Sequence, residues 1–284
     1  MPEKLKVNLH LTQMCNYHCR HCFAHFPDRQ DLSLSEWKAI IDNLSRSGLV
    51  DSINFAGGEP VLYRWFPELA LYAHGKGFRL SIITNGSLLQ KRRFFPEELF
   101  PLFDMFGFSI DSLNAETLRK IGRCDENGIT LSGLDFVSLV STIKSHNPKA
   151  QIKINTVVSK LNRNEKLVRI EEDVLIDRWK FLKIKPFATE NFSNKKMLVS
   201  DRDFDIFVAR NHRNYGETVV ERTLERSYLV IDNAGNLLDN HGESYAIVGN
   251  LLHEPFVDVL RRFELDEREY RQRYAARQEA QVQS

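Results

Sequence analysis

Three cysteines stand close together near the amino terminus and could hold one inorganic centre. Cys15, Cys19 and Cys22 follow a Cys-x₃-Cys-x₂-Cys spacing, so a single short loop carries all three thiolates. Zinc sites usually draw four ligands from two separated pairs, and no second cysteine pair follows. A three-cysteine [4Fe–4S] cluster instead leaves one iron open for a small chelating ligand. Two alternatives stay open on spacing alone. They are free buried thiols and a Cys₃His zinc site that uses one of three histidines: His18, His21 and His25.

A second motif, Gly57-Gly58-Glu59-Pro60, follows the second expected strand. Paired glycines let the backbone approach a ligand closely, and the Glu59 carboxylate can accept hydrogen bonds from an ammonium group. Taken alone, the motif is equally typical of a tight turn. Small polar groups also stand at the ends of the next two expected strands: Asn85, Ser109 and, beyond Ser109, Arg123. Each is an ordinary cap or turn residue by itself, but together they can line one mouth.

Cations alternate on two later expected strands. Lys153 and Asn155 share one face of the fifth strand, and Arg178 and Lys180 share one face of the sixth. Three cations that point into one volume favour a phosphate chain as ligand. The alternative is that these side chains extend through the helix layer to solvent.

Alternating strands and helices must position these residues. The hydrophobic pattern predicts six short strands: Val7–Thr12, Ser52–Phe55, Arg79–Ile83, Met105–Ile110, Gln151–Val157 and Trp179–Ile184. It predicts helices between them: Leu34–Ser47, Trp65–His74, Pro96–Leu102, Ala115–Ile121 and Leu131–Ser145. This rhythm indicates a parallel sheet, either doubly wound or a partial barrel, with active residues on loops after the strands.

The rhythm fades after Pro186, where we expect a C-terminal extension. A helix at Asp201–His212, a strand at Tyr228–Ile231 and a helix at His253–Phe263 are predicted there. The tail from Asp266 to Ser284 is charged, and we expect it to be helical at first and frayed at its end.

Composition narrows the function classes. The chain has 284 residues and a net charge of +1, which argues against a surface that wraps long nucleic acid. We expect no membrane attachment, because no signal-peptide pattern and no apolar run of ~20 residues occur. Clustered cysteines are poor disulfide partners and predict a cytoplasmic metal site instead.

The cysteine spacing together with the Gly-Gly-Glu-Pro motif resembles the radical S-adenosylmethionine superfamily. The resemblance implies a partial (βα)6 TIM-like barrel, with a core at residues 1–190 and an extension at 191–284 that completes the substrate site. It implies a [4Fe–4S] cluster on Cys15, Cys19 and Cys22, whose open iron binds S-adenosylmethionine and whose electron generates a 5′-deoxyadenosyl radical. The implied contacts to S-adenosylmethionine are Gly57, Gly58, Glu59, Asn85, Ser109 and Arg123.

Within that superfamily the chain is most similar to the viperin family. The similar stretch runs from Asn8 through Tyr228, and its motifs occur in the family's order: CNYHCRHCF, INFAGGEP, TNGSL, SIDS, IGR, KINTVV, RWK and the start of SYLVID. The resemblance implies that a ribonucleoside triphosphate binds Lys153, Asn155, Arg178 and Lys180 and is dehydrated to its 3′-deoxy-3′,4′-didehydro analogue, a terminator of viral polymerases. It implies that Tyr228 helps to deliver hydrogen, and that an electron donor such as flavodoxin or ferredoxin reduces the cluster.

The chain departs from animal-type viperins in several places. Ser52 and Ala56 replace a lysine and a serine beside the nucleotide site, and the amphipathic N-terminal helix and the C-terminal tryptophan are missing. The resemblance therefore indicates a prokaryotic homologue and leaves the base open. Two other functions remain: a radical enzyme acting on a peptide or another small molecule, and a non-catalytic zinc module. No cysteine follows Cys124, which disfavours the auxiliary clusters of many peptide-modifying members.

Overall fold

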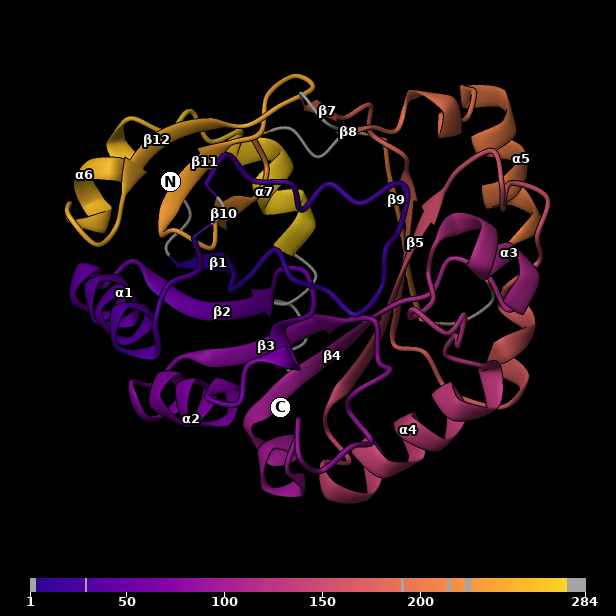
Figure 1. The fold of residues 1–284 in the computed structure, drawn as a ribbon, viewed down its shortest axis with the longest axis horizontal. Coiled ribbons are helices and arrows are strands. Elements are labelled where there is room, and N and C mark those ends of the chain that lie inside the picture. Colours follow the sequence, from indigo (N-terminus) through magenta and orange to yellow (C-terminus); the bar gives the residue numbers. More distant parts are fainter. Residues whose placement is uncertain (1–3, 29, 190–191, 214–215, 223–225, 275–284) are drawn as a thin grey trace.

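The structure is a computed structural model that describes residues 4–28, 30–189, 192–213, 216–222 and 226–274. Its centre is one curved sheet of ten strands, with helices on the outer side (Figure 1). Eight of these strands are parallel and neighbour one another in this spatial order: β10 (Leu229–Ile231), β1 (Leu5–His10), β2 (Val50–Ala56), β3 (Arg79–Thr84), β4 (Phe103–Ser109), β5 (Gln151–Val158), β6 (Arg178–Lys183) and β9 (Glu217–Glu221). Two antiparallel strands extend the sheet beyond β10: β11 (Asn236–Asp239) and β12 (Ala246–Asn250). The architecture is a partial α/β barrel, as the sequence predicts.

Helices connect most of the parallel strands. They are α1 (Leu34–Ser47), α2 (Phe66–Gly75), α3 (Ala115–Ile121), α4 (Gly133–His146) and α5 (Asp201–Arg210). Helix α1 begins at a capping box, in which Ser33 and Glu36 satisfy each other's backbone N–H groups, and it ends at Gly48 with φ 64°. These local signals explain why the predicted bounds of α1 are confirmed.

The core lies between the helices and the outer face of the sheet. On β1, Leu5, Val7 and Leu9 point outward into this layer and are at most 1% exposed. Lys6 and His10, the alternating residues, point to the inside of the barrel and are also buried. An apolar outer face and a polar inner face are therefore built into one strand, and the polar face is the one available for chemistry.

Several elements differ from the sequence prediction. The expected helix Pro96–Leu102 is a 3₁₀ helix, η2 (Glu97–Leu102), because Pro101 inside it lacks the N–H that an α-helix needs. The rhythm does not fade as expected after Pro186, since β9 extends the parallel sheet beyond β6 and β10 pairs in parallel with β1. The sequence pattern did not reveal β9, because its five residues, ETVVE, are too few and show no alternation of apolar and polar residues.

The C-terminal helices are α6 (Phe256–Arg261), which begins after Pro255 and is shorter than predicted, and α7 (Glu267–Tyr274). The predicted helical start of the tail is confirmed by α7, and its predicted end lies outside the described residues. Short elements complete the fold: η1 (Pro60–Leu62), η3 (Val168–Glu172), β7 (Ala188–Thr189), β8 (Phe192–Ser193) and η4 (Lys195–Met197).

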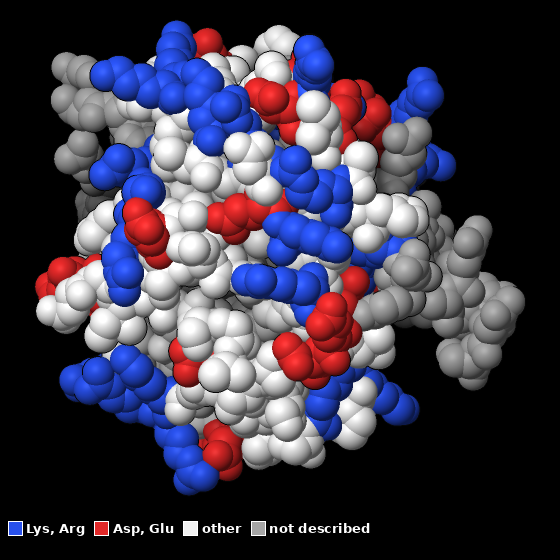
Figure 2. All heavy atoms as spheres, turned by 90° about the vertical axis from the view of Figure 1, so that its right-hand side faces the viewer, with Lys and Arg blue, Asp and Glu red and all other residues white. Residues whose placement is uncertain are grey.

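The surface mixes both signs of charge. On the face that carries α5 and β9, basic and acidic side chains lie next to one another, in keeping with the net charge of +1 (Figure 2). Among the described residues, none of the helices combines the length and the hydropathy that crossing a bilayer requires.

Candidate active site

The inside of the barrel is a cavity of about 880 Å³. Its walls are the inward residues of β1 to β6 and the loop after β1, and Tyr228 closes one side. A volume of this size suits two small ligands held side by side. Every residue that the sequence predicts for the site lines this cavity except Glu59, which lies directly behind it.

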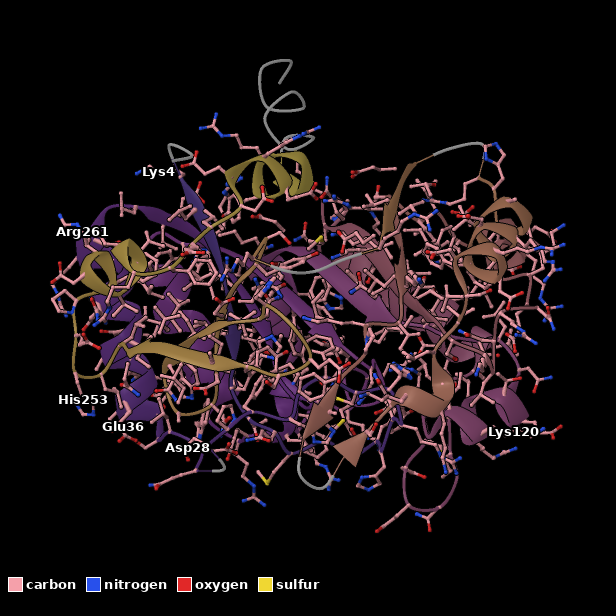
Figure 3. All side chains as sticks on the ribbon, turned by 90° about the horizontal axis from the view of Figure 1, so that it is seen from above. Lys4, Asp28, Glu36, Lys120, His253 and Arg261 are labelled. Carbon is pink, nitrogen blue, oxygen red and sulfur yellow. The ribbon has the colours of Figure 1, made fainter. Side chains whose placement is uncertain are left out.

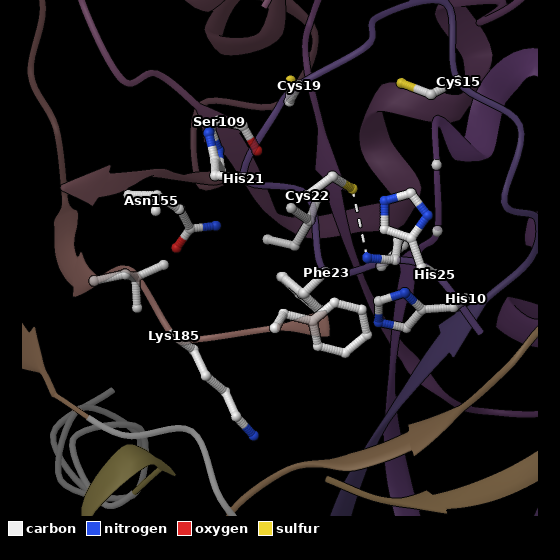
Figure 4. A pocket seen from close by; sticks show the side chains of 18 of the residues that line it. His10, Cys15, Cys19, His21, Cys22, Phe23, His25, Ser109, Asn155 and Lys185 are labelled. Atoms are coloured by element: carbon white, nitrogen blue, oxygen red, sulfur yellow. Dashed lines mark hydrogen bonds between the residues drawn. The ribbon is translucent and has the colours of Figure 1, made fainter. Parts of the chain in front are cut away.

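The cysteine loop forms one end of the cavity, where Cys15, Cys19 and Cys22 are grouped (Figure 4). Two backbone N–H groups point at sulfur, Tyr17 N at Cys15 Sγ over 3.4 Å and Ala24 N at Cys22 Sγ over 3.4 Å. Such N–H groups stabilise thiolate charge, which a bound cluster requires.

The donor set fits a cluster with three thiolate ligands. Burial raises the pKa of Cys15 to about 11 and that of Cys19 to about 12, so the thiols are protonated until a metal centre displaces their protons. No group of histidine, cysteine, aspartate or glutamate within the described ranges is arranged to hold a single metal ion.

The paired glycines join this loop to the sheet. Gly58 N donates to Thr12 O over 2.6 Å, and Glu59 N donates to Met14 O over 2.8 Å. A Cβ on Gly57, whose φ is 141°, would lie 2.7 Å from Thr12 O. Only glycine fits there, because the backbone of the cysteine loop occupies the space that a side chain needs. The sequence predicts that these glycines admit a ligand, which stays a prediction, and in the structure they make room for the cysteine loop.

Glu59 is fully buried and holds the end of β3. Its carboxylate accepts a hydrogen bond from Thr84 Oγ1 over 2.8 Å and another from Asn85 N over 2.9 Å. Burial raises the pKa of Glu59 to about 7 despite these bonds. Contact with the amino group of S-adenosylmethionine stays a prediction, since the carboxylate serves Thr84 and Asn85 here.

Asn85 directly follows β3, and Ser109 is the last residue of β4. Both lie beside the cysteine loop. Asn85 Nδ2 donates to Asn16 Oδ1 over 2.9 Å and lies 3.8 Å from Cys15 Sγ. Asn85 therefore already contacts the segment where a ligand of the open iron would sit. Ser109 lines the cavity further along the same rim (Figure 4).

Arg123 reaches the cavity as part of a buried charged group. Its Nε donates to Asp111 Oδ2 over 2.6 Å, and the same oxygen lies 3.3 Å from His21 Nε2. Burial by itself raises the pKa of Asp111, but the Arg123 charge outweighs it and holds that pKa well below its usual range. The carboxylate of Asp111 is thus ionised and fixes the guanidinium at the cluster end of the cavity.

The cations on β5 and β6 lie together as predicted. Lys153 pairs with Arg178 and Asn155 pairs with Lys180 across the two parallel strands, and all four side chains line the cavity. The alternative, that they extend to solvent through the helix layer, is wrong. Arg178 Nε lies 3.0 Å from Glu217 Oε2, and Lys180 forms an ion pair with Glu221 in which both side chains are 5% exposed.

The Tyr228 side chain connects the start of β10 with β6 and β9. Its hydroxyl donates to Glu221 Oε2 over 2.9 Å and accepts from Lys180 Nζ over 2.9 Å. Glu221 ends β9 and Tyr228 directly precedes β10, so these side chains span the side where the parallel strands do not pair. The phenol is held at the cavity wall by an anion and a cation.

Three polar residues of this site were not predicted from the sequence: Lys6, His10 and Glu221. Alternation of Lys6, Asn8 and His10 with leucine and valine on β1 could have revealed an inward polar face. Burial lowers the pKa of His10 to about 4, so its imidazole is neutral, and it packs against the edge of Phe26. Glu221 had no comparable signal, because its partners are distant in the chain.

The chain is similar to known proteins in both sequence and fold. Residues 9–135 match the radical SAM superfamily. An S-adenosylmethionine-dependent nucleotide dehydratase from Selenomonas ruminantium is 50% identical over 270 residues, which cover 95% of this chain and 98% of the relative. The S-adenosylmethionine-dependent nucleotide dehydratase RSAD2 of Danio rerio is 29% identical and covers 82% of this chain and 66% of its own length. The crystal structure of Streptococcus suis SuiB bound to S-adenosylmethionine has a TM-score of 0.67 at 16% identity and covers 94% of this chain and 67% of that chain.

These findings define a radical S-adenosylmethionine protein with the partial barrel of that fold. Within that superfamily, the chain belongs to the S-adenosylmethionine-dependent nucleotide dehydratases, the viperin family. The resemblance drawn from the sequence is confirmed. The cofactors of this class are a [4Fe–4S] cluster and S-adenosylmethionine, so the zinc-module alternative is wrong.

Proposed function

We propose that this enzyme dehydrates a ribonucleoside triphosphate to its 3′-deoxy-3′,4′-didehydro analogue, a chain terminator for viral polymerases. One observation carries the proposal: a single cavity has the cysteine loop at one end and three inward cations on β5 and β6 along its wall. The 50% identity to a nucleotide dehydratase supports a nucleotide, rather than a peptide, as the second ligand.

The residues of the cluster end hold the cofactors. Cys15, Cys19 and Cys22 bind three irons of the [4Fe–4S] cluster. When bound, the cluster and S-adenosylmethionine would supply a 5′-deoxyadenosyl radical for abstraction of the 4′ hydrogen of the ribose. The residues that contact S-adenosylmethionine are Gly57, Gly58, Glu59, Asn85, Ser109 and Arg123. Asp111 keeps Arg123 in place for a carboxylate, because the buried ion pair fixes the guanidinium.

The residues of the opposite wall hold the nucleotide. Lys153, Arg178 and Lys180 bind the phosphate chain, and Asn155 donates a side-chain hydrogen bond beside them. Glu217 pairs with Arg178, and Glu221 pairs with Lys180. These two cations therefore have partners before a nucleotide binds, which lowers the cost of burying them. The 3′ hydroxyl would leave with a proton as water, and one electron from the reductant would then be needed to give the didehydro product.

Tyr228 is placed to deliver hydrogen to the nucleotide in the final reduction. Its hydroxyl lies on the cavity wall and is oriented by Glu221 and Lys180. Because Tyr228 and Glu221 both come from residues 191–284, this extension completes the substrate site of the core at residues 1–190. An electron donor such as flavodoxin or ferredoxin reduces the cluster, and a cytoplasmic location stays a prediction.

The test is anaerobic incubation of the reconstituted enzyme with S-adenosylmethionine, a reductant and each of the four ribonucleoside triphosphates in turn. We expect 5′-deoxyadenosine together with a nucleotide that has lost one water from at least one triphosphate. If no triphosphate raises cleavage of S-adenosylmethionine above the background rate, the proposal is wrong.

Matched variants separate binding from folding. Lys153→Ala should raise the KM for the nucleotide roughly tenfold or more while iron content is unchanged, because a charge-assisted contact is lost. Lys149→Ala, which changes an exposed lysine two residues before β5, should leave the KM as it is. Loss of iron in Lys153→Ala would instead mark the residue as structural.

A further inference from the structure

Lys6 is an inward cation on the wall opposite β5 and β6. It is the second residue of β1, is 6% exposed and lines the cavity together with Asn8 and His10. The register places His10 beside Ala56, next to the Gly57 loop, and Lys6 beside Ser52, four residues earlier. At ~3.3 Å per residue, Lys6 lies about 13 Å along the strand from the level of that loop.

A chain of neutral groups holds the Lys6 ammonium in one direction. Lys6 Nζ donates to Ser81 Oγ over 2.6 Å, and Ser81 Oγ donates to Asn54 Oδ1 over 2.9 Å. Asn54 Nδ2 in turn donates to Asn8 Oδ1 over 3.1 Å. These bonds cross β1, β2 and β3, so the ammonium is positioned by rigid strands rather than by a loop.

The Lys6 backbone is fixed as well. Its N–H donates to Tyr270 Oη over 2.6 Å, and Tyr270 belongs to α7 and is 2% exposed. Helix α7 therefore packs against the start of β1.

Tyr228 links this wall to the other cations. Leu229 of β10 pairs with Val7 of β1. Tyr228 and Lys6, each one residue earlier, are therefore neighbours across these two parallel strands. The Tyr228 hydroxyl accepts from Lys180 Nζ over 2.9 Å. Lys6 and Lys180 therefore line one cavity, Lys6 on the strand that neighbours Tyr228 and Lys180 in contact with the Tyr228 hydroxyl.

The direction of the nucleotide follows from the two ends of the cavity. The ribose must lie near the cysteine loop, which follows the carboxyl end of β1, since the radical forms there. The phosphate chain must then run toward the amino ends of the strands, and its last phosphate reaches furthest. Lys6, near the amino end of β1, is placed for that last phosphate.

We propose that Lys6 binds the terminal phosphate of the nucleotide and makes the enzyme distinguish a triphosphate from a diphosphate. This inference rests on the proposed nucleotide dehydratase function and adds a residue, and a specificity, to it. An ammonium fixed by Ser81 gives a directed charge-assisted contact to the terminal phosphate, and a diphosphate is too short to reach it.

The test compares kcat/KM for a ribonucleoside triphosphate and its diphosphate in the cluster-loaded enzyme. We expect the wild type to prefer the triphosphate. Lys6→Met should lower kcat/KM for the triphosphate roughly ten- to hundredfold, the range for a lost hydrogen bond to a charged group, and leave the diphosphate value nearly unchanged. The ratio between the two substrates then falls toward one.

Lys4→Met is the matched control. Lys4 lies at the periphery of the molecule, where its Nζ donates to Gly48 O over 2.8 Å (Figure 3). This variant removes the same charge from the same end of the chain, and its triphosphate preference should equal that of the wild type. A similar loss of preference in Lys4→Met would show a general charge effect and overturn the proposal.

Two results would contradict the role of Lys6 directly. One is equal kcat/KM for triphosphate and diphosphate in the wild type. The other is a Lys6→Met variant that loses both substrates by the same factor. If Lys6→Met fails to load iron, Lys6→Gln, which keeps a donor toward Ser81, is used in the same comparison with the same expected fall in the ratio.

Binding of inorganic triphosphate and diphosphate, measured by calorimetry on the cluster-loaded enzyme, separates this inference from the proposed function. A preference for inorganic triphosphate that disappears in Lys6→Met supports the phosphate site even if no nucleotide is dehydrated. Turnover of a nucleotide with no such preference supports the proposed function and contradicts the role of Lys6.

Discussion

Gly58 is the position where one added methyl group should disconnect the cysteine loop from the barrel. A Cβ at this residue would lie 2.8 Å from Gln13 O and closer still to Met14 O. Ordinary contact needs ~3.5 Å, so the loop must retreat by at least about 0.7 Å. The neighbours are backbone atoms, which cannot rotate away as a side chain does.

The same movement stretches the two bonds that hold the loop. Gly58 N to Thr12 O, now 2.6 Å, and Glu59 N to Met14 O, now 2.8 Å, both pass toward or beyond the limit of a good hydrogen bond. At ~0.5–1.5 kcal/mol each, their loss costs about 1–3 kcal/mol locally. A shift of this size also exceeds the ~0.5 Å tolerance of a preorganised ligand set.

Gly58→Ala should therefore fold but take up much less iron than the wild type after anaerobic reconstitution. Iron per chain and the cluster absorbance measure the loss, and circular dichroism checks the fold. Gly75→Ala, at the end of α2, is the control, because a Cβ there meets nothing within 4 Å and iron loading should be unchanged. Normal iron content in Gly58→Ala would refute the reasoning.

Three further predictions concern stability. Tyr270→Phe should lower the free energy of unfolding by about 1–2 kcal/mol in denaturant titrations, because Lys6 N loses its acceptor; an unchanged midpoint would mean that α7 contributes nothing there. Lys180→Met should cost about 3 kcal/mol by leaving Glu221 buried without its cation, and adding Glu221→Gln should recover much of it; a double variant no more stable than the single one contradicts this. The pKa of Glu59 is raised to about 7, so the folded state holds a proton that the unfolded state releases near its ordinary pKa, and stability of the cluster-free protein should fall as pH rises from about 4.5 to 7. Glu59→Gln should flatten that slope in urea titrations, and an equal slope in both proteins would show that another group causes it.

The site is partly encoded in local patterns. Cys15, Cys19 and Cys22 lie on one loop, so their grouping needs no knowledge of the fold. The alternation of Lys153 with Asn155 and of Arg178 with Lys180 likewise predicts a shared face, and the register of β5 and β6 confirms it. Periods of two residues along a strand survive folding because side chains alternate between the faces.

No local sequence pattern predicts the ion pairs that form between distant parts of the chain. Glu221 ends a strand that the sequence did not reveal, and it meets Lys180 only because β9 pairs with β6. Asp111 lies in the SIDS motif, but its burial against Arg123 is visible only in the structure. Such ion pairs depend on where distant strands meet, which composition and spacing do not specify.

The amino-acid sequence by itself determined the cysteine loop, the glycine pair, the βα rhythm and the family resemblance, because each depends on neighbours along the chain. Only the tertiary structure decided what shares the cavity with them. The parallel register brings Lys6 into the same cavity as the cations of β5 and β6, and it brings Tyr228, just before β10, to Lys180 and to Glu221 at the end of β9. Gly57 and Gly58 show both levels at once: the sequence marks a close backbone approach, and the fold shows that the approaching chain is the cysteine loop itself.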